Sequence, residues 1–434
     1  MSKENKENTE NMENKENKEI YLDNSATTKI DPQILKIVAR IAEESYGNPS
    51  SIHRKGREAE RNLNASRKEL AGLLGVKDNE IIFTSGGTEA NNMAILGLAR
   101  RYRKKGNHLI TTAIEHPSIL EPFLILEKEG FEVTYLPPDS QGIIEPQSAL
   151  QALRPETILV SIMHVNNETG ALQPIAQVAA LLKKEKKELL LHTDAVQSFG
   201  KIPLPPGLQG IDALSISAHK FHGPKGTGAL FLRDGILLTP LLGGGGQERG
   251  LRPGTENTPG IAGMVLAARQ SYTGMKERSA QLRQMKRQLL SSLEQRHPWI
   301  RLNGPRDESE TEVAESEGIS APKEGGARHE KSASEERSAP HIINISFPGI
   351  KGEIIVHALG EQGIFVSTGA ACHSRAKSDN HVLSAMGVNE ERRASAIRFS
   401  LSALTKPEEI IYAAEKINET VSKLKELHEK MAPR

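Results

Sequence analysis

The run Ser215-Ile-Ser-Ala-His-Lys-Phe-His-Gly-Pro-Lys-Gly-Thr-Gly228 constrains the fold of this chain more than any other stretch. The apolar segment 211–216 predicts a buried strand, which ends in small and polar residues, a lysine and a glycine-rich turn. An isolated lysine is usually a surface residue. Lys220, however, follows the end of the predicted strand, where we expect it to enter a cleft. Ser217 and His219, just before it, can bind a phosphate. Since a lysine stripped of water can form a Schiff base, this strand end is a candidate site for covalent chemistry.

A second polar strand end lies upstream, in Leu189-Leu-Leu-His-Thr-Asp-Ala-Val-Gln197. An apolar strand ends there at Asp194, and Gln197 follows shortly after. Pyridoxal phosphate (PLP) requires a lysine, groups that hold its phosphate, and an acid that faces its pyridine nitrogen. The two strand ends together therefore favour PLP as the cofactor.

Strand and helix patterns alternate through the first two thirds of the chain. The expected strands are 108–112, 132–136, 158–163 and 189–193, and the expected helices are 119–129 and 175–187. This alternation predicts an α/β layer with a mainly parallel sheet, in which ligands bind at the carboxyl ends of the strands. His116 and Asn167 follow two of these strands, as Asp194 follows a third.

A candidate phosphate cradle lies in Glu80-Ile-Ile-Phe-Thr-Ser-Gly-Gly-Thr-Glu-Ala-Asn-Asn92. The pattern predicts a strand that enters a helix through Gly86 and Gly87, with Thr88 at the N-cap position. Backbone N–H groups at a helix start bind anions, and glycine allows a ligand to approach closely.

These motifs resemble a known family. Asp-Ala-x-Gln followed by Ser-x-His-Lys-x-x-Gly-Pro-Lys-Gly resembles the class V aminotransferase-like PLP enzymes, specifically the cysteine desulfurases and the related selenocysteine lyases. The resemblance extends from Tyr21 to Lys423 and is interrupted once. It implies the α/β fold type I of PLP-dependent transferases, with a mixed, mainly parallel sheet between helices and a smaller α+β C-terminal domain.

The resemblance also implies domain bounds. We expect an N-terminal segment at 20–30 that joins the small domain and the active site, a large PLP-binding domain at 31–265, and a small C-terminal domain at 266–434. A long amphipathic helix at 260–296 should lead into the small domain.

The family's site residues carry over by motif. The expected cofactor-binding residues are Gly87, Thr88, His116, Asn167, Asp194, Gln197, Ser217, His219 and Lys220. The resemblance implies a homodimer in which Thr255, from the glycine-rich run 243–258, reaches the PLP phosphate of the partner subunit. His116 would stack on the cofactor ring and move protons, and Lys220 would act as the base for the substrate α-proton. Arg398 offers a planar fork for the substrate α-carboxylate, with Asn167 nearby.

Cys372 is the one cysteine of the chain, which excludes an internal disulfide and a multi-cysteine metal cluster. We expect no metal site, beyond a transient contact of Cys372 with an iron–sulfur cluster. A buried structural cysteine usually has apolar neighbours. Cys372 instead follows small residues and precedes a polar stretch, 375–381, that we expect to be a mobile loop, so we interpret it as a reactive thiol.

Three functions remain open at this point. The first is a cysteine desulfurase that converts L-cysteine to L-alanine and passes a persulfide from Cys372 to a sulfur-acceptor or iron–sulfur scaffold protein, or into tRNA thiolation. The second is a selenocysteine lyase, because Gly-Ala-Ala-Cys-His-Ser and Gly-Gly-Gln-Glu-Arg resemble that branch as well. The third is a non-catalytic binding homologue, which is disfavoured because all of the catalytic candidates are present: Lys220, Asp194, His116, Arg398 and Cys372.

Charge balance and the lengths of the apolar runs indicate which partners and which location to expect. Lys and Arg number 56 against 55 Asp and Glu among 434 residues, which provides no basic field for nucleic acid. No apolar run approaches the roughly 18 residues of a membrane helix. The first twenty residues are hydrophilic, so we expect neither a signal peptide nor a transit peptide and predict a cytoplasmic protein. Residues 1–19 and 306–339 contain too few apolar side chains to fold, and we expect both to be disordered.

Overall fold

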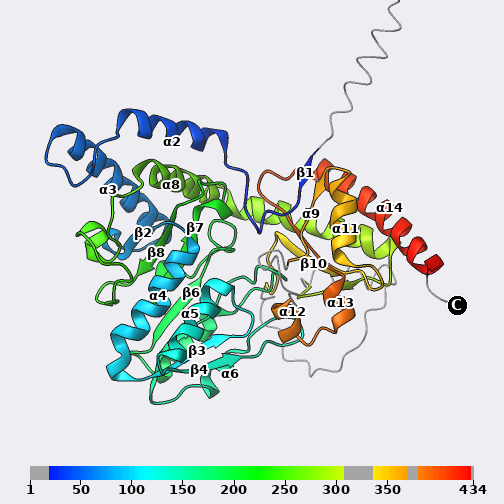
Figure 1. The fold of residues 1–434 in the computed structure, drawn as a ribbon, viewed down its shortest axis with the longest axis horizontal. Coiled ribbons are helices and arrows are strands. Elements are labelled where there is room, and N and C mark those ends of the chain that lie inside the picture. Colours follow the sequence, from blue (N-terminus) through cyan, green and yellow to red (C-terminus); the bar gives the residue numbers. More distant parts are fainter. Residues whose placement is uncertain (1–18, 307–335, 370–379, 432–434) are drawn as a thin grey trace, which may run out of the picture.

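The computed structural model describes residues 19–306, 336–369 and 380–431, which form a larger and a smaller lobe (Figure 1). The large lobe contains a seven-stranded sheet in the order β2-β8-β7-β6-β5-β3-β4. Its strands are β2 (Ile81–Thr84), β3 (His108–Thr112), β4 (Glu132–Leu136), β5 (Thr157–Ser161), β6 (Leu190–Asp194), β7 (Ala213–Ser217) and β8 (Gly228–Leu232). The strands β4, β3, β5, β6 and β7 pair in parallel, whereas β8 is antiparallel to both β7 and β2. The predicted mixed, mainly parallel sheet is therefore confirmed.

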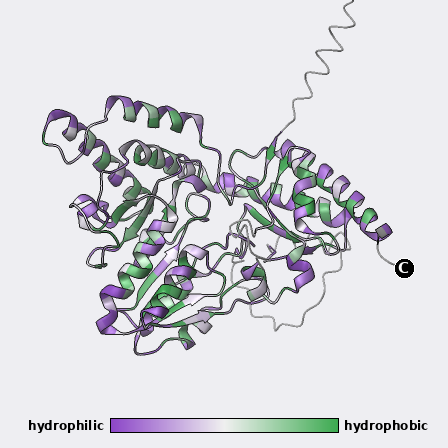
Figure 2. Ribbon diagram, viewed as in Figure 1, coloured by the Kyte–Doolittle hydropathy of each residue, from purple (hydrophilic) through white to green (hydrophobic). Residues whose placement is uncertain are grey.

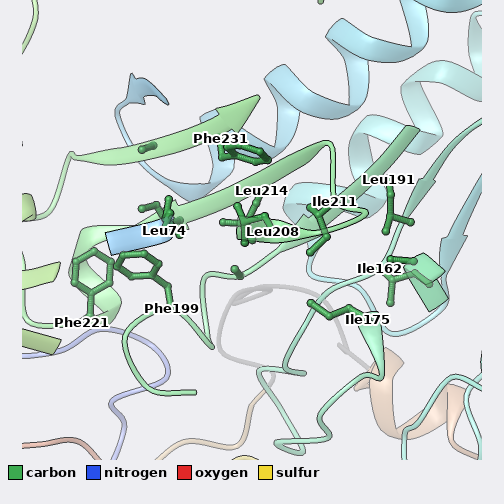
Figure 3. Close-up of a cluster of buried hydrophobic side chains, with 14 of the residues drawn as sticks. Leu74, Ile162, Ile175, Leu191, Phe199, Leu208, Ile211, Leu214, Phe221 and Phe231 are labelled. Carbon is green, nitrogen blue, oxygen red and sulfur yellow. The ribbon is translucent and has the colours of Figure 1, made fainter. Parts of the chain in front are cut away.

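Helices cover both faces of this sheet because its buried strands are apolar on both sides. One face packs against α4 (Gly87–Tyr102) and α5 (Pro117–Lys128), and the other against α3 (Arg54–Leu74), α7 (Ile175–Glu185) and α8 (Thr258–Tyr272). Neighbouring residues of one strand alternate between the two cores: Leu190 packs in the first and Leu191 in the second. Figure 3 shows Leu191, Leu214 and Phe231 in the second core, and Figure 2 shows the apolar strands between helices with hydrophilic outer faces. The large lobe also contains α2 (Pro32–Glu44) and α6 (Pro146–Gln151).

The small lobe has its own sheet and core. Its antiparallel sheet has the order β12-β10-β9, formed by β9 (Arg301–Leu302), β10 (Ile342–Ser346) and β12 (Ala396–Ser400). Its helices are α9 (Met275–Arg296), α11 (Gly352–Gly360), α12 (His381–Ala385), α13 (Glu390–Ala394) and α14 (Pro407–Met431). The N-terminal strand β1 (Ile20–Tyr21) pairs in parallel with β11 (Ile364–Phe365), and Ile20 and Leu22 lie in the small-lobe core. The domain bounds stay predictions.

The single helix expected at 260–296 is wrong, because two helices occupy this range. The chain breaks between α8 and α9 at Gly274, which has a left-handed φ of 66° that glycine adopts at little cost. The Arg278 guanidinium donates to the carbonyl of Gln270, at 2.9 Å, and to that of Ser271. These hydrogen bonds satisfy carbonyl groups at the end of α8. An isolated glycine in an otherwise helical pattern gave no warning of this break.

The predicted bounds of the insertion also need correction. Ser338 and Ala339 are fully buried, and Ser338 forms a β-bridge with Ala171. Lys286 donates to the Ser338 hydroxyl and, at 3.3 Å, to the Ala339 carbonyl. At the other end, Arg306 pairs with Glu294. These contacts order 336–339 and residue 306, so the expected disorder there is wrong; 307–335 and 1–18 lie outside the described residues. Within the described ranges, no helix has the length and apolarity to cross a membrane.

Candidate active site

A cavity of about 340 Å³ lies at the carboxyl ends of β5, β6 and β7, where the two lobes meet. Ten of the residues singled out from the sequence line it: Gly87, Thr88, His116, Asn167, Asp194, Gln197, Ser217, His219, Lys220 and Arg398. Thr255 is exposed and does not line this cavity in its own chain. Cys372 lies outside the described residues. Among the described residues, no cluster of three His, Cys, Asp or Glu side chains could hold a metal ion.

Lys220 is anchored by the N-terminal segment. Strand β7 ends at Ser217, and the short 3₁₀ helix η4 (Ala218–Lys220) places the lysine at the cavity. Its ammonium donates to the carbonyls of Ser25, at 2.6 Å, and Ala26, at 2.8 Å. The chain segment that begins in the small lobe therefore passes directly over the lysine. Backbone acceptors of this kind leave no signal in the sequence.

Asp194 is buried at the end of β6, with a hydrogen bond to each carboxylate oxygen. The backbone N–H of Val196 donates to Oδ1 at 2.9 Å, and the Asn91 amide donates to Oδ2 at 2.8 Å. Burial raises the pKa of Asp194, while these two hydrogen bonds and the nearby charge of Lys220 lower it. We did not single out Asn91 from the sequence. Its position four residues after Gly87, on the same helix face, was the available signal.

The first turn of α4 forms a candidate anion cradle. The helix begins at Gly87 with Gly86 as N-cap, so the predicted N-cap position of Thr88 is wrong. A Cβ on Gly87 would lie 2.8 Å from the Val196 side chain and 3.4 Å from that of Ser217. A side chain at position 87 would therefore crowd Val196. Gly87, Thr88 and Ser217 all line the cavity at this helix start, where the first N–H groups have no partner within the helix.

The two cavity histidines differ in their surroundings. His219 contacts the Thr27 hydroxyl at 3.2 Å, and burial, with smaller contributions from the charges of Lys220, Lys225 and Lys201, lowers its pKa to about 4. It is therefore neutral at pH 7.

His116 caps α5, since its Nδ1 accepts from the Ser118 backbone N–H at 3.1 Å. The Ser118 hydroxyl accepts from Asn91 at 2.8 Å. A hydrogen-bonded chain thus connects His116 through Ser118 and Asn91 to Asp194.

Arg398 is held between two carboxylates. From β12 it donates to Glu168 Oε1 and to Asp23 Oδ1, each at 2.9 Å, and to the Asn167 carbonyl at 3.1 Å. Burial raises the pKa of Glu168, and the charge of Arg398 lowers it. The Asn167 amide donates to the same Glu168 oxygen at 2.8 Å. A substrate carboxylate would thus bind to an arginine that two acids already orient. We did not predict these two acids from the sequence.

The chain on either side of Cys372 reaches this same cavity. Gly369 and Asn380, which flank the segment outside the described residues, both line it. Gly369 has a φ of 78°, and a Cβ there would lie 1.8 Å from Glu168 Oε2. Glycine is therefore required at 369, beside the acid that orients Arg398.

The buried carboxyl of Glu115, next to His116, should make the free energy of unfolding depend on pH. Its buried carboxyl accepts from the Thr112 hydroxyl and the Met163 backbone N–H, both at 2.9 Å, and Oε2 has no partner among the described residues. Burial, the largest effect, raises its pKa to about 8. The folded protein therefore holds a proton that the unfolded chain releases near its ordinary value of 4.5.

The free energy of unfolding should therefore fall as pH rises from about 4.5 to about 8, by up to ~1.4 kcal/mol per pH unit from this group. Glu115→Gln stays neutral in both states, so we expect it to flatten this slope and to be more stable than the wild type at pH 8. Urea unfolding at a series of pH values measures the effect, with the exposed Glu121→Gln as control. Parallel pH profiles for Glu115→Gln and the wild type would show that Glu115 is ionised in the fold.

Comparisons with known proteins agree with this geometry. Residues 20–316 and 327–412 match the family described as aminotransferase class-V. A cysteine desulfurase IscS of Dictyoglomus turgidum is 40% identical over 407 residues, which cover 94% of this chain and 95% of that protein. A cysteine desulfurase IscS of Methanosarcina thermophila is 39% identical over 408 residues, 94% of this chain and 93% of that protein.

Solved structures give the same result. A NifS-like protein superposes with a TM-score of 0.81 at 37% identity, covering 94% of this chain and all of that one. The structure described as SspA in complex with cysteine has a TM-score of 0.69 at 32% identity, covering 89% of this chain and 99% of that one. The chain belongs to the aminotransferase class-V family. Within that family its relatives include proteins named cysteine desulfurase, and the resemblance predicted from the motifs is confirmed.

Proposed function

We propose that this protein is a PLP-dependent cysteine desulfurase. The observation that carries the proposal is that Lys220, the buried Asp194 and the first turn of α4 all line one cavity. This combination supplies a Schiff-base lysine, a partner for a pyridine nitrogen and a phosphate cradle within a single site. A binding homologue without catalysis would not require the lysine and the acid together.

The described residues fit PLP. The first turn of α4, with Ser217 and His219 beside it, would hold the phosphate. Asp194, fixed by Asn91 and Val196, would face the pyridine nitrogen. Gln197 donates to the Ser25 carbonyl at 3.0 Å, while its buried Oε1 has no partner among the described residues and is left for a donor in the cavity. An unsatisfied buried acceptor is costly, so a ligand group there is expected.

Each side chain then has a role in binding or proton transfer. When bound, PLP supplies an electron sink that weakens the bonds at the α-carbon of an amino acid. Lys220 lies at the cavity, where it can take up the substrate α-proton. His116, whose Nδ1 accepts from the Ser118 backbone N–H, would stack on the cofactor ring and move protons. Arg398, oriented by Glu168 and Asp23, binds the substrate α-carboxylate.

Cys372 is within reach of this site on covalent geometry alone. It lies three residues after Gly369, which lines the cavity. Three residues span at most about 10 Å even when fully extended. We infer that its thiolate attacks the sulfur of the substrate cysteine. A sulfur–sulfur bond forms, the substrate carbon–sulfur bond breaks, and the products are alanine and a persulfide on Cys372.

The partners follow from this chemistry. We infer that the persulfide passes to a sulfur-acceptor or iron–sulfur scaffold protein. We also infer a homodimer in which the exposed Thr255 binds the cofactor phosphate of the second subunit, since it does not line the cavity of its own chain. The cytoplasmic location stays a prediction from the sequence.

Product analysis tests the proposed function. Purified, PLP-loaded protein with L-cysteine and a thiol reductant should release alanine and sulfide in equal amounts. The same assay with L-selenocysteine tests the lyase alternative. Selenide release without measurable sulfide would overturn the desulfurase in favour of the lyase, and neither product would favour the binding homologue.

Residues outside the described fold should be dispensable for turnover. We expect that removing 1–18, or replacing 307–335 with a short Gly-Ser linker, leaves cysteine turnover in the presence of a reductant within about twofold, because a doubling of loop length costs only about 0.6 kcal/mol. A deletion that also removes 336–339 is the contrast: it should destabilise the protein, since Lys286 loses Ser338 and Ala339. Steady-state rates and melting temperatures measure both effects. A large loss of turnover in the 307–335 variant with an unchanged melting temperature would mean that this segment shapes the site.

A further inference from the structure

A second cavity, of about 240 Å³, lies at the break between α8 and α9, and it shares no lining residue with the Lys220 cavity. It is bounded by both lobes. The large lobe contributes Lys201, which follows β6, and the small lobe contributes His341, directly before β10, and Leu401, directly after β12. Nothing in the proposed desulfurase reaction uses this cavity.

Lys201 contributes a buried amine that has no counter-charge among the described residues. Its Nζ is buried and has no hydrogen-bond partner among the described residues. Burial, and to a smaller extent the charge of Lys220, lowers its pKa to about 7. Burying an ammonium without a partner is strongly unfavourable, and natural folds pair or hydrogen-bond such groups.

His341 presents a second unsatisfied group in the same cavity. The side chain is 0% exposed, and neither Nδ1 nor Nε2 has a partner among the described residues. Burial holds its pKa well below the ordinary value, and the charges of Lys201, Lys286 and Arg283 lower it further. A neutral imidazole still carries one N–H donor, so each lobe places one buried donor without a described partner beside this cavity.

The charged groups around this cavity are mostly positive. Arg278 lines it and donates to the last carbonyls of α8, and the charges of Lys286 and Arg283 act on His341. The lining acid is Asp31, whose carboxylate accepts from the Gln33 backbone N–H at the start of α2. Two further acids lie on neighbouring elements: Glu277 acts on Arg278, and Glu336 pairs with Arg283. His222 also lines the cavity and contacts the Lys29 carbonyl at 2.9 Å.

We propose that this cavity is a binding site for a small anion, an inorganic oxyanion or a small carboxylate, which accepts hydrogen bonds from Lys201 and His341. The anion supplies the acceptor that both side chains lack among the described residues, and its negative charge favours the charged form of Lys201. Because Lys201 belongs to the large lobe and His341 to the small lobe, a bound anion ties the two lobes together. The proposal is independent of the proposed desulfurase activity.

Calorimetric titration of the full-length, PLP-loaded protein tests this site, since the cofactor then occupies the phosphate cradle of the other cavity. Sulfate and acetate are the two probes, each measured against chloride at matched ionic strength. Their relative affinities distinguish an oxyanion site from a carboxylate site. We expect one anion bound per chain, and affinity about tenfold or more weaker in Lys201→Met and in His341→Leu.

Lys184→Met, the same substitution at an exposed lysine of α7, should bind like the wild type. Both cavity variants remove an unsatisfied buried polar group, so each should fold, and either one alone decides the test. Selenate soaked into crystals should give its anomalous peak between Lys201 and His341. No saturable binding of either probe, equal binding in the cavity and control variants, or a selenate peak elsewhere would overturn the proposal.

Discussion

Cys372→Ala is expected to bind PLP with wild-type affinity and to lose sulfide release from L-cysteine by on the order of a thousandfold or more. The cofactor-binding residues come from the large lobe and are untouched by this change. The substitution removes the nucleophile that accepts the substrate sulfur, and the chain has no other cysteine to replace it. The visible absorbance of the bound cofactor and the rate of sulfide release measure the two halves of this prediction.

Selenocysteine gives the same variant a second readout. A selenol is more acidic than a thiol and its carbon–selenium bond is weaker, so some selenide release can persist without Cys372. Loss of sulfide with substantial selenide release would identify the thiol as a sulfur relay and add weight to a selenocysteine activity. Full cysteine desulfuration by Cys372→Ala would contradict the nucleophilic mechanism and leave Cys372 a packing residue.

Lys220→Ala is expected to abolish both covalent cofactor attachment and turnover. Lys220 supplies an amine to the cavity at the end of β7. The Ser25 and Ala26 carbonyls, which accept hydrogen bonds from it, cannot replace this amine as a base. We expect turnover to fall by at least about 10³-fold, since the substitution removes both the nucleophile and the proton acceptor. Absorbance spectra and steady-state rates measure the effect.

Lys225→Ala, an exposed lysine five residues further along the same loop, is the matched control and should keep colour and activity. A Lys220→Ala protein that stays covalently attached to PLP would show that another amine holds the cofactor. Wild-type protein that remains colourless after incubation with PLP would remove the basis for the enzyme altogether.

The sequence was most informative where function depends on position along one element. Strands β3 and β4 have the bounds predicted from their apolar runs, because short runs between polar residues and glycine define strands well. Lys220 and Asp194 were found because each follows an apolar run that predicts a buried strand. The family and the fold class, both predicted from motifs, are confirmed.

What the sequence could not provide were contacts between distant segments. Asp23 and Arg398 are 375 residues apart in the chain yet form an ion pair. No periodicity predicts such a pair, nor the burial of Ser338 beside Lys286. The break at Gly274 was missed because glycine is tolerated within helices, and only the packing of the two lobes decides whether the chain turns there.

Mass spectrometry of the peptide that carries Cys372 tests the central claim most directly. The PLP-loaded protein is incubated with L-cysteine in the absence of a reductant, quenched with an alkylating agent and digested. We predict one additional sulfur atom on Cys372 in the wild type, together with an equal amount of alanine, and neither the modification nor the alanine in Lys220→Ala. Alanine and sulfide formed by the wild type at full rate, with Cys372 unmodified at every time point, would contradict the account.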